Sequence, residues 1–272
     1  MASYNEISTA TLTRLVGTTD CPVLLDVRID EDFDADPHLI PGAYRQPFLR
    51  VGDLAESLKG QHVIVYCQKG LKISQGAAAI LRNSGVQAEV LEGAQFAWRD
   101  AGLPMVLAEN LPALTQAGHT LWVTRHRPKI DRIACPWLIR RFINPKAQFL
   151  FVSAPQVRNV AERFGATPFD IEDVFWSHGD DRCTFDTMID EFGIENKALA
   201  KLAPIVRGAD TNEPGLAPEA AGLLAASLGL SRMYRNDLEQ QEAGMLLYDA
   251  FYRWARDATD EGHDWPASSK KP

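Results

Sequence analysis

Cysteine is scarce in this sequence. Only four of the 272 residues are cysteines, at positions Cys21, Cys67, Cys135 and Cys183, and none of them forms a CxxC pair. This scattered spacing is typical neither of a disulfide framework nor of a common zinc site. We therefore expect a reduced, cytoplasmic protein in which a free thiol can serve as a chemical group.

Long apolar runs, an export signal and an excess of positive charge are also missing. No stretch approaches the roughly 18 uninterrupted apolar residues of a membrane-spanning helix, and residues 1–15 have neither a basic lead nor an apolar core. The formal net charge is −8, whereas a large nucleic-acid surface needs clustered cations. We accordingly expect no membrane partner and no nucleic-acid partner.

The apolar content that is present suffices for two domains. Hydrophobic residues make up 46% of the chain, and its length suits two domains of about 100–200 residues. In the first part, expected strands at 22–27, 62–66 and 88–91 alternate with expected helices at 73–81 and 94–101. Strands that alternate with helices predict an α/β fold with a parallel sheet and flanking helices.

The second part of the chain has a different pattern of expected strands and helices. After a segment with little periodicity, expected strands at 121–124 and 148–152 enclose a helix at 136–143. From residue 154 onward the spacing is mainly helical, with helices expected at 154–164, 184–192, 197–207, 217–229 and 236–257. We predict a mainly helical α/β or α+β second domain. The expected divisions are a first domain at 1–106, a linker at 107–119, a second domain at 120–258 and a frayed tail at 259–272.

Cys67 has the strongest chemical signal in the first domain, because it stands where a buried strand ends and a helix begins. Loop N–H groups, the helix N-terminus, Lys69 and Lys72 are expected to converge on the thiol and to lower its pKa below about 8.5. Gly70 permits a tightly wrapped loop. The proposed binding loop comprises Gln68, Lys69, Gly70, Leu71 and Lys72. The alternative is that Cys67 is only a buried structural cysteine.

Several separate motifs in this domain resemble the rhodanese family in order and spacing. They are Leu24–Arg28, His38–Ala43, Tyr66–Cys67, Leu91–Gly93 with Trp98, and Gly102–Pro104. The resemblance implies a persulfide on Cys67, a thiosulfate-like sulfur donor and a thiol acceptor. The loop from Cys67 to Lys72 has the six-residue length typical of the family's sulfurtransferases, whereas related phosphatases have one residue more.

One pair of residues and one single residue near Cys67 call for separate interpretation. We assign Asp26 and Arg28 to support of the loop by ion pairing, with no part in the chemistry. Lys72 stands where many rhodaneses have arginine, so the bidentate contact with an oxyanion is replaced by a point charge.

The second domain begins with a basic segment. Residues 124–132 contain five basic side chains, His126 included, directly after a predicted strand. Proline is favoured at the first position of a helix, so Pro136 suggests a helix that begins there with Cys135 at its cap. That location would make Cys135 a reactive thiol. Equally, the helix begins near Ile130 and Cys135 packs in its interior. The basic side chains form either an oxyanion pocket or a solvated loop.

A second group of polar residues follows in this domain. His178, Cys183 and Asp186 place an imidazole, a thiol and a carboxylate within nine residues, a set that can bind a transition metal. The spacing is not a known zinc pattern. Alternatively, Asp186 only lies in the first turn of the helix that follows.

Five segments of this domain resemble the C-terminal domain of chromate-resistance proteins of the ChrB type. They are Arg125–Phe142, His178–Asp186, Arg207–Thr211, Glu219–Leu223 and Tyr248–Tyr252. The better-known members of that family regulate chromate-efflux operons, but their N-terminal portion differs from this one. Chromate is a tetrahedral dianion shaped like thiosulfate and sulfate. Arg125, Arg132 and His178 are therefore the candidate ligands of chromate or another oxyanion.

Three functional hypotheses follow. The leading one is a cytoplasmic sulfurtransferase that carries a persulfide on Cys67, coupled to an oxyanion- or metal-binding domain, with Cys135 or Cys183 as a possible acceptor of the sulfur. The alternative is a chromate or oxyanion sensor in which the rhodanese fold only binds. The third is a metalloprotein that uses His178, Cys183 and Asp186. No cofactor beyond this possible transition metal is expected, and the sequence does not define the oligomeric state.

Overall fold

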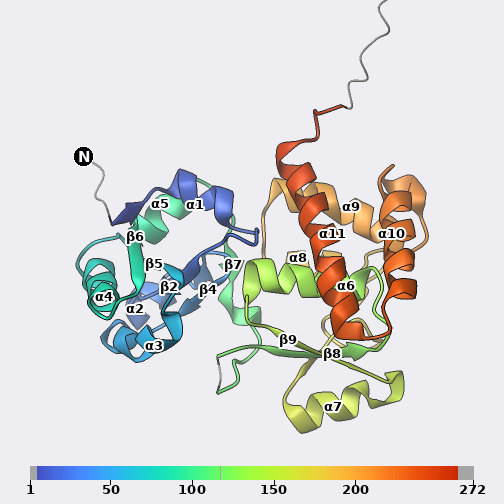
Figure 1. Ribbon diagram of the computed structural model, residues 1–272, viewed down its shortest axis with the longest axis horizontal. Helices are drawn as coiled ribbons and strands as arrows, with labels where there is room; N and C mark the ends of the chain where they lie inside the picture. Colours follow the sequence, from blue (N-terminus) through green and yellow to red (C-terminus); the bar gives the residue numbers. More distant parts are fainter. Residues whose placement is uncertain (1–4, 117, 263–272) are drawn as a thin grey trace, which may run out of the picture.

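The first domain is built on a five-stranded sheet. The computed structural model describes residues 5–116 and 118–262, which Figure 1 shows as two bodies side by side. All strand pairs of this sheet are parallel, in the order β1-β6-β5-β2-β4. Its strands are β1 (Glu6–Ile7), β2 (Val23–Asp26), β4 (Ala43–Arg45), β5 (His62–Tyr66) and β6 (Gln87–Leu91). The helices are α1 (Thr9–Leu15), α2 (Asp30–Asp34), α3 (Ala55–Leu58), α4 (Lys72–Asn83) and α5 (Ala94–Asp100), with a 3-10 helix at Phe48–Leu54.

Both faces of this sheet are covered by helices, as Figure 1 shows. Successive strand residues point to opposite faces. Val63 and Val65 of β5 pack with residues of α3 and α4, while Ile64 and Tyr66 pack with residues of α1 and α5. A strand buried on both faces needs a continuous apolar run. The apolar run at 62–66 is the pattern from which we predicted β5. The expected α/β fold with a parallel sheet and flanking helices is confirmed.

The segment that connects the two domains is hydrogen-bonded to each of them. Strand β7 (Val106–Leu107) pairs antiparallel with β3 (His38–Leu39) and leads into a 3-10 turn at Ala108–Asn110. The Leu107 N–H donates to Phe192 O at 2.9 Å, and the Ala108 N–H donates to Pro37 O at 3.0 Å. The start of the expected linker is thus held by hydrogen bonds on either side.

The two domains also contact each other directly. The Gly42 N–H donates to Phe142 O at 2.6 Å, and Arg256 Nη1 donates to Arg14 O at 3.0 Å. Gly17 has a φ of +78°, and a Cβ added there would lie 2.6 Å from Phe142 Cζ. Only glycine fits this close approach without a shift of the ring. The interface therefore depends on packing as well as on the connecting segment.

The second domain combines a small sheet with six α-helices in its described part. The sheet is parallel, in the order β10-β8-β9, with strands β8 (Leu121–Arg125), β9 (Gln148–Val152) and β10 (Thr167–Pro168). The helices are α6 (Asp131–Leu138), α7 (Val157–Phe164), α8 (Thr184–Glu191), α9 (Lys197–Asp210), α10 (Ala220–Met233) and α11 (Asp237–Asp257). Short helical turns lie at Ile139–Ile143, Ala154–Gln156 and Pro214–Leu216. In Figure 1, α7 covers one face of the sheet and α6 and α8 lie on the other. The expected mainly helical second domain is confirmed.

Of the two positions predicted for the helix near Cys135, the later one is wrong. Helix α6 begins at Asp131, five residues before Pro136, and the chain continues as a π-helical turn at Ile139–Ile143. The Ile133 and Ala134 N–H groups both donate to Ile130 O, which fixes the start of the helix ahead of the proline. Cys135 therefore lies inside the helix, where it is fully buried.

The sequence led us to expect a frayed C-terminal tail and no membrane-spanning helix. Helix α11 ends at Asp257, and residues 263–272 of the expected frayed tail lie outside the described residues. Within residues 5–116 and 118–262, no helix has the length and apolar character needed to cross a membrane.

Candidate functional site

Cys67 lies at the carboxyl end of β5, at the foot of α4. The loop that joins these elements is held by the start of α5, because the Gln95 N–H donates to Cys67 O at 3.2 Å and the Phe96 N–H donates to Gln68 O at 3.1 Å. Gly70 has a φ of +75°, and a Cβ there would lie 3.0 Å from Leu91 O. The tight loop therefore requires glycine at this position.

The Cys67 thiol is almost buried and is surrounded by hydrogen-bond donors. It is 5% exposed, and its Sγ lies 3.4 Å from Ser74 Oγ in the first turn of α4. Burial alone would raise the pKa of Cys67. The Ser74 hydroxyl and the backbone N–H groups of Ser74, Lys69 and Leu71 outweigh burial and lower the pKa below its ordinary value. The loop thus favours the thiolate, which is the nucleophilic form.

The two lysines of the loop are placed less closely than the sequence suggested. Lys69 is exposed, and its ammonium group lies 5.9 Å from the centre of the Phe96 ring. Lys72 is the first residue of α4 and is also exposed. The groups that lower the pKa of Cys67 come from the backbone and from Ser74. Sequence reasoning missed Ser74, although its place three residues into the helix was a usable signal.

Asp26 and Arg28 form a buried ion pair at the end of the neighbouring strand β2. Arg28 Nη2 lies 2.5 Å from Asp26 Oδ2, and both side chains are fully buried. Arg28 also donates to the carbonyls of Asp36 and His38. The Asp36 carboxylate accepts from Gln95 Nε2 at 2.5 Å. A chain of contacts therefore joins this ion pair to the helix start that holds the Cys67 loop.

A second polar site lies in a cleft of about 370 Å³ in the second domain. The predicted oxyanion ligands Arg125, Arg132 and His178 all line it, so the structure brings them together. Its other charged side chains are Lys129, Asp170 and Asp210. Arg125 Nη2 and Arg132 Nε each lie 3.1 Å from Asp170 Oδ2. The cleft is therefore lined by cations and carboxylates together.

His178 faces three carboxylates. Its Nε2 lies 3.2 Å from Asp210 Oδ2, 3.3 Å from Asp170 Oδ1 and 3.5 Å from Asp131 Oδ2. Hydrogen bonds with Asp170 and Asp210 raise the pKa of His178 to about 10. Burial, Asp210 and Asp170 raise the pKa of Asp131 well above its usual range. In contrast, His178, Arg132 and Arg125 lower the pKa of Asp170 although burial opposes them.

Sequence reasoning missed these three carboxylates. They come from the first residue of α6, the segment after β10 and the last residue of α9. Nothing in the local spacing indicates that such distant positions meet. Asp131 and Asp210 do lie inside segments that resembled ChrB-type proteins, which was the only available signal.

Cys183 and Asp186 lie at the start of α8 and cap that helix. Asp186 Oδ2 accepts from the Cys183 N–H at 3.1 Å and lies 3.3 Å from Cys183 Sγ. Burial together with Asp131 and Asp186 raises the pKa of the Cys183 thiol. Among the described residues, the group that could hold a metal is instead Asp131, Asp170 and His178. His178 therefore has other partners than Cys183 and Asp186, which the sequence had suggested. Asp186 lies in the first turn of α8, as in the alternative interpretation.

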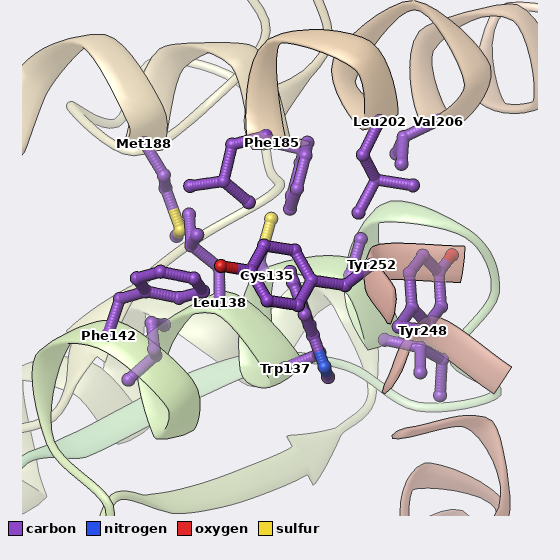
Figure 2. Packing of buried hydrophobic residues seen from close by; sticks show 14 of the residues in the cluster. Cys135, Trp137, Leu138, Phe142, Phe185, Met188, Leu202, Val206, Tyr248 and Tyr252 are labelled. Carbon is purple, nitrogen blue, oxygen red and sulfur yellow. The ribbon is translucent and has the colours of Figure 1, made fainter. Parts of the chain in front are cut away.

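Cys135 packs in the core of the second domain. Figure 2 shows its thiol among side chains of α6, α8, α9 and α11, including Trp137, Phe185 and Tyr248. Burial and Asp131 raise the pKa of Cys135 well above its ordinary value. Since Cys183 is also fully buried, neither thiol is presented as an acceptor of sulfur from Cys67.

Comparisons with known proteins find a match to a different family model in each half of the chain. Residues 8–101 match the model of the rhodanese-like domain, and residues 122–255 match that of the ChrB C-terminal domain. Protein ChrB of Cupriavidus metallidurans is 33% identical over 192 residues, which cover 65% of this chain and 57% of that protein. The chain therefore spans less than two thirds of the length of this curated relative.

Other relatives match a smaller part of the chain. A sulfurtransferase of Allochromatium vinosum is 27% identical over 107 residues, which cover 39% of this chain and 98% of that protein. Among solved structures, a rhodanese-related protein from Thermoplasma volcanium covers 38% of this chain and 99% of its own, at 24% identity and a TM-score of 0.33.

Proposed function

Because this chain joins a rhodanese-like domain to a ChrB C-terminal domain, we propose that it is a sulfurtransferase whose Cys67 carries the transferred sulfur as a persulfide. One observation carries the proposal. The Cys67 thiol lies at the foot of α4, and loop N–H groups with the Ser74 hydroxyl lower its pKa. A buried structural cysteine, by contrast, has a raised pKa, as Cys135 does.

The first half-reaction loads the sulfur. The Cys67 thiolate attacks the outer sulfur of a thiosulfate-like donor, and a new S–S bond forms. The S–S bond of the donor breaks, and sulfite leaves with its electron pair. In the resulting persulfide, Cys67 Sγ keeps its position and the terminal sulfur carries the negative charge, which the loop with the N–H groups of Lys69, Leu71 and Ser74 would stabilise.

The second half-reaction unloads the sulfur. An acceptor thiolate attacks the terminal sulfur of the persulfide, and the electron pair of the broken S–S bond returns to Cys67. The acceptor is a separate molecule in this proposal, because Cys135 and Cys183 are fully buried. The exposed side chains of Lys69 and Leu71 form the rim over which donor and acceptor approach.

The test is cyanide-dependent production of thiocyanate from thiosulfate, with intact mass measured before cyanide is added. We expect turnover and one extra sulfur on the wild type, and a loss of more than about 1000-fold in Cys67→Ser because the nucleophile is gone. Cys21→Ser is the matched control, since burial raises the pKa of Cys21 to about 12. If several donors give neither turnover nor persulfide, the first domain is a binding module and the proposal is rejected.

A specific observation favours a second activity, oxyanion binding in the cleft of the second domain. Arg125, Lys129 and Arg132 line the cleft together with His178. The Arg125 side chain is 43% exposed at the cleft although its Nη2 lies 3.1 Å from Asp170 Oδ2. A planar guanidinium that is half-exposed suits a tetrahedral oxyanion such as chromate.

This binding is tested by calorimetric titration of the full chain with chromate and with sulfate, in the presence of a chelator. Loss of a charged hydrogen bond costs about 1.5–3 kcal/mol, so Arg125→Gln should weaken binding by at least about tenfold. Arg158→Gln, an exposed arginine beside Asp173, is the control and should leave the affinity unchanged. Equal affinities in the two variants would exclude the cleft as the oxyanion site.

A further inference from the structure

Three carboxylates converge on one imidazole nitrogen in the second domain. Asp131, Asp170 and Asp210 each place an oxygen within 3.5 Å of His178 Nε2. One ring N–H cannot donate well to three acceptors at once. Three carboxylates in one place also repel each other unless a cation lies among them. Arg125 and Arg132 both pair with Asp170, so among the described residues His178 is the cation that pairs with Asp131 and Asp210.

Contacts outside the group fix the orientation of two of the carboxylates, Asp170 and Asp131. Asp170 Oδ2 is held by Arg125 and Arg132, which leaves Oδ1 on the side of His178. Asp131 Oδ2 accepts from the Thr184 N–H at 2.5 Å. Outer contacts that orient ligating carboxylates in this way are typical of metal sites.

An independent observation comes from the other oxygen of Asp131. This residue is 1% exposed, and its Oδ1 is buried without any hydrogen-bond partner. A buried carboxylate oxygen without a partner is costly. Asp131 faces the group, since its ligand oxygen and those of Asp170 and His178 all lie within 4.8 Å of one another. The Asp131 carboxylate thus lies in the group with one of its oxygens unpaired, and a cation bound there would offset its buried charge.

We propose that Asp131, Asp170 and His178, with Asp210 beside them, bind a divalent metal cation. Carboxylate oxygens combined with one imidazole nitrogen suit a first-row divalent ion such as Mn²⁺. Two ligands at right angles around an ion, with bond lengths of about 2.1 Å, are about 3.0 Å apart, and His178 Nε2 lies 3.2–3.5 Å from the three carboxylate oxygens. Asp170, His178 and Asp210 line the cleft, which gives the ion a path from solvent.

The experiment strips the full chain with a chelator and titrates it with MnCl₂, ZnCl₂ or MgCl₂. Metal analysis after desalting and the EPR signal of free Mn²⁺ measure the bound ion. We expect one equivalent of at least one of these ions per chain. Asp210→Asn and His178→Gln keep the side-chain size, and each should weaken binding at least about tenfold. Asp131 is left unchanged, because it accepts the Thr184 N–H that begins α8.

Asp173→Asn is the matched control, because it also removes one carboxylate and its side chain is 91% exposed. It should bind the ion as tightly as the wild type. Circular dichroism of each variant shows whether the fold is kept. The proposal is overturned if none of the three ions reaches half an equivalent, or if Asp210→Asn binds like Asp173→Asn. It does not rest on sulfur transfer, so Cys67→Ser should bind the ion normally.

Discussion

The two polar sites of this protein are built in opposite ways. Around Cys67, one loop supplies backbone N–H groups and the nearby Ser74 hydroxyl, all within residues 67–74. Around His178, carboxylate side chains arrive from residues 131, 170 and 210. The first site stabilises a negative charge, whereas the second collects negative charge around a cationic centre. In Figure 1, α4 next to Cys67 and α10 beside the cleft lie at opposite ends of the molecule.

The difference shows which sites a sequence reveals. Backbone donors are present in every residue, so a strand, a short loop and a helix are enough to place them around a thiol. A group of carboxylates depends on side chains that only the tertiary fold brings together. The arginines near the two sites also differ in burial. Arg28, near the Cys67 loop, is buried in its ion pair, whereas Arg125 lies half-exposed at the edge of the cleft.

The largest expected effect comes from replacing these arginines. Arg28→Met leaves the buried Asp26 carboxylate without its partner, so the free energy of unfolding should fall by about 3–5 kcal/mol. Arg125→Met removes a half-exposed partner from Asp170, which keeps Arg132, and should cost less than about 1 kcal/mol. Urea unfolding followed by circular dichroism measures both changes.

Arg50→Met is the control for this comparison, since Arg50 and Asp53 form an ion pair in which both side chains are more than half exposed. It should change the free energy of unfolding by less than about 0.5 kcal/mol. Equal losses in Arg28→Met and Arg125→Met would remove the distinction between a supporting ion pair and a cleft ion pair.

A smaller effect is expected from Ser74→Ala. The lowered pKa of Cys67 predicts that alkylation by iodoacetamide accelerates as pH rises through a midpoint below the ordinary thiol value of about 8.5. Loss of the Ser74 hydroxyl withdraws a donor from the thiolate, so the midpoint should move up. One charged hydrogen bond is worth about 1.5–3 kcal/mol, so the rate at pH 7 should fall at least about tenfold.

Alkylation is measured in the Cys21→Ser background, so that Cys67 is the reactive thiol observed. Ser57→Ala is the control, because Ser57 Oγ donates to Leu54 O on the surface, away from the thiol. A midpoint that stays in place after Ser74→Ala would mean that the backbone N–H groups alone hold the thiolate.

Much of the fold followed from local patterns. Ser8 accepts from the Thr11 N–H and begins α1, which is the role that serine favours at the start of a helix. The apolar run before Cys67 predicted β5, and the helical spacing after residue 154 predicted the later helices to within a few residues. These signals succeed because burial and capping act on neighbouring residues. The two-residue strands such as β3 and β10 carry no such pattern and were missed.

The site around His178 was harder to predict from the sequence, for physical reasons. Pro136 left two helix starts open, and the Ile130 carbonyl sets the earlier one, so Cys135 is a core residue and not the reactive thiol of the other alternative. His178 seemed to belong with Cys183 and Asp186, which are close in sequence. In the fold, Asp186 caps α8 and His178 faces carboxylates from other elements. Tertiary contacts decide such partnerships, and single-sequence patterns do not contain them.

The smallest expected effect distinguishes backbone from side-chain binding at the Cys67 loop. Lys72 begins α4 and is exposed, and we predict that it would contribute only a point charge to a bound oxyanion. Lys72→Arg supplies a bidentate fork and should lower the KM for thiosulfate by about threefold with little change in kcat, since one added surface contact contributes about 0.5–1 kcal/mol. Lys59→Arg, a lysine paired with Glu56 on the surface, is the control. If kcat changes and KM does not, Lys72 acts on the transition state and the loop resembles the His178 site in its dependence on side-chain charge.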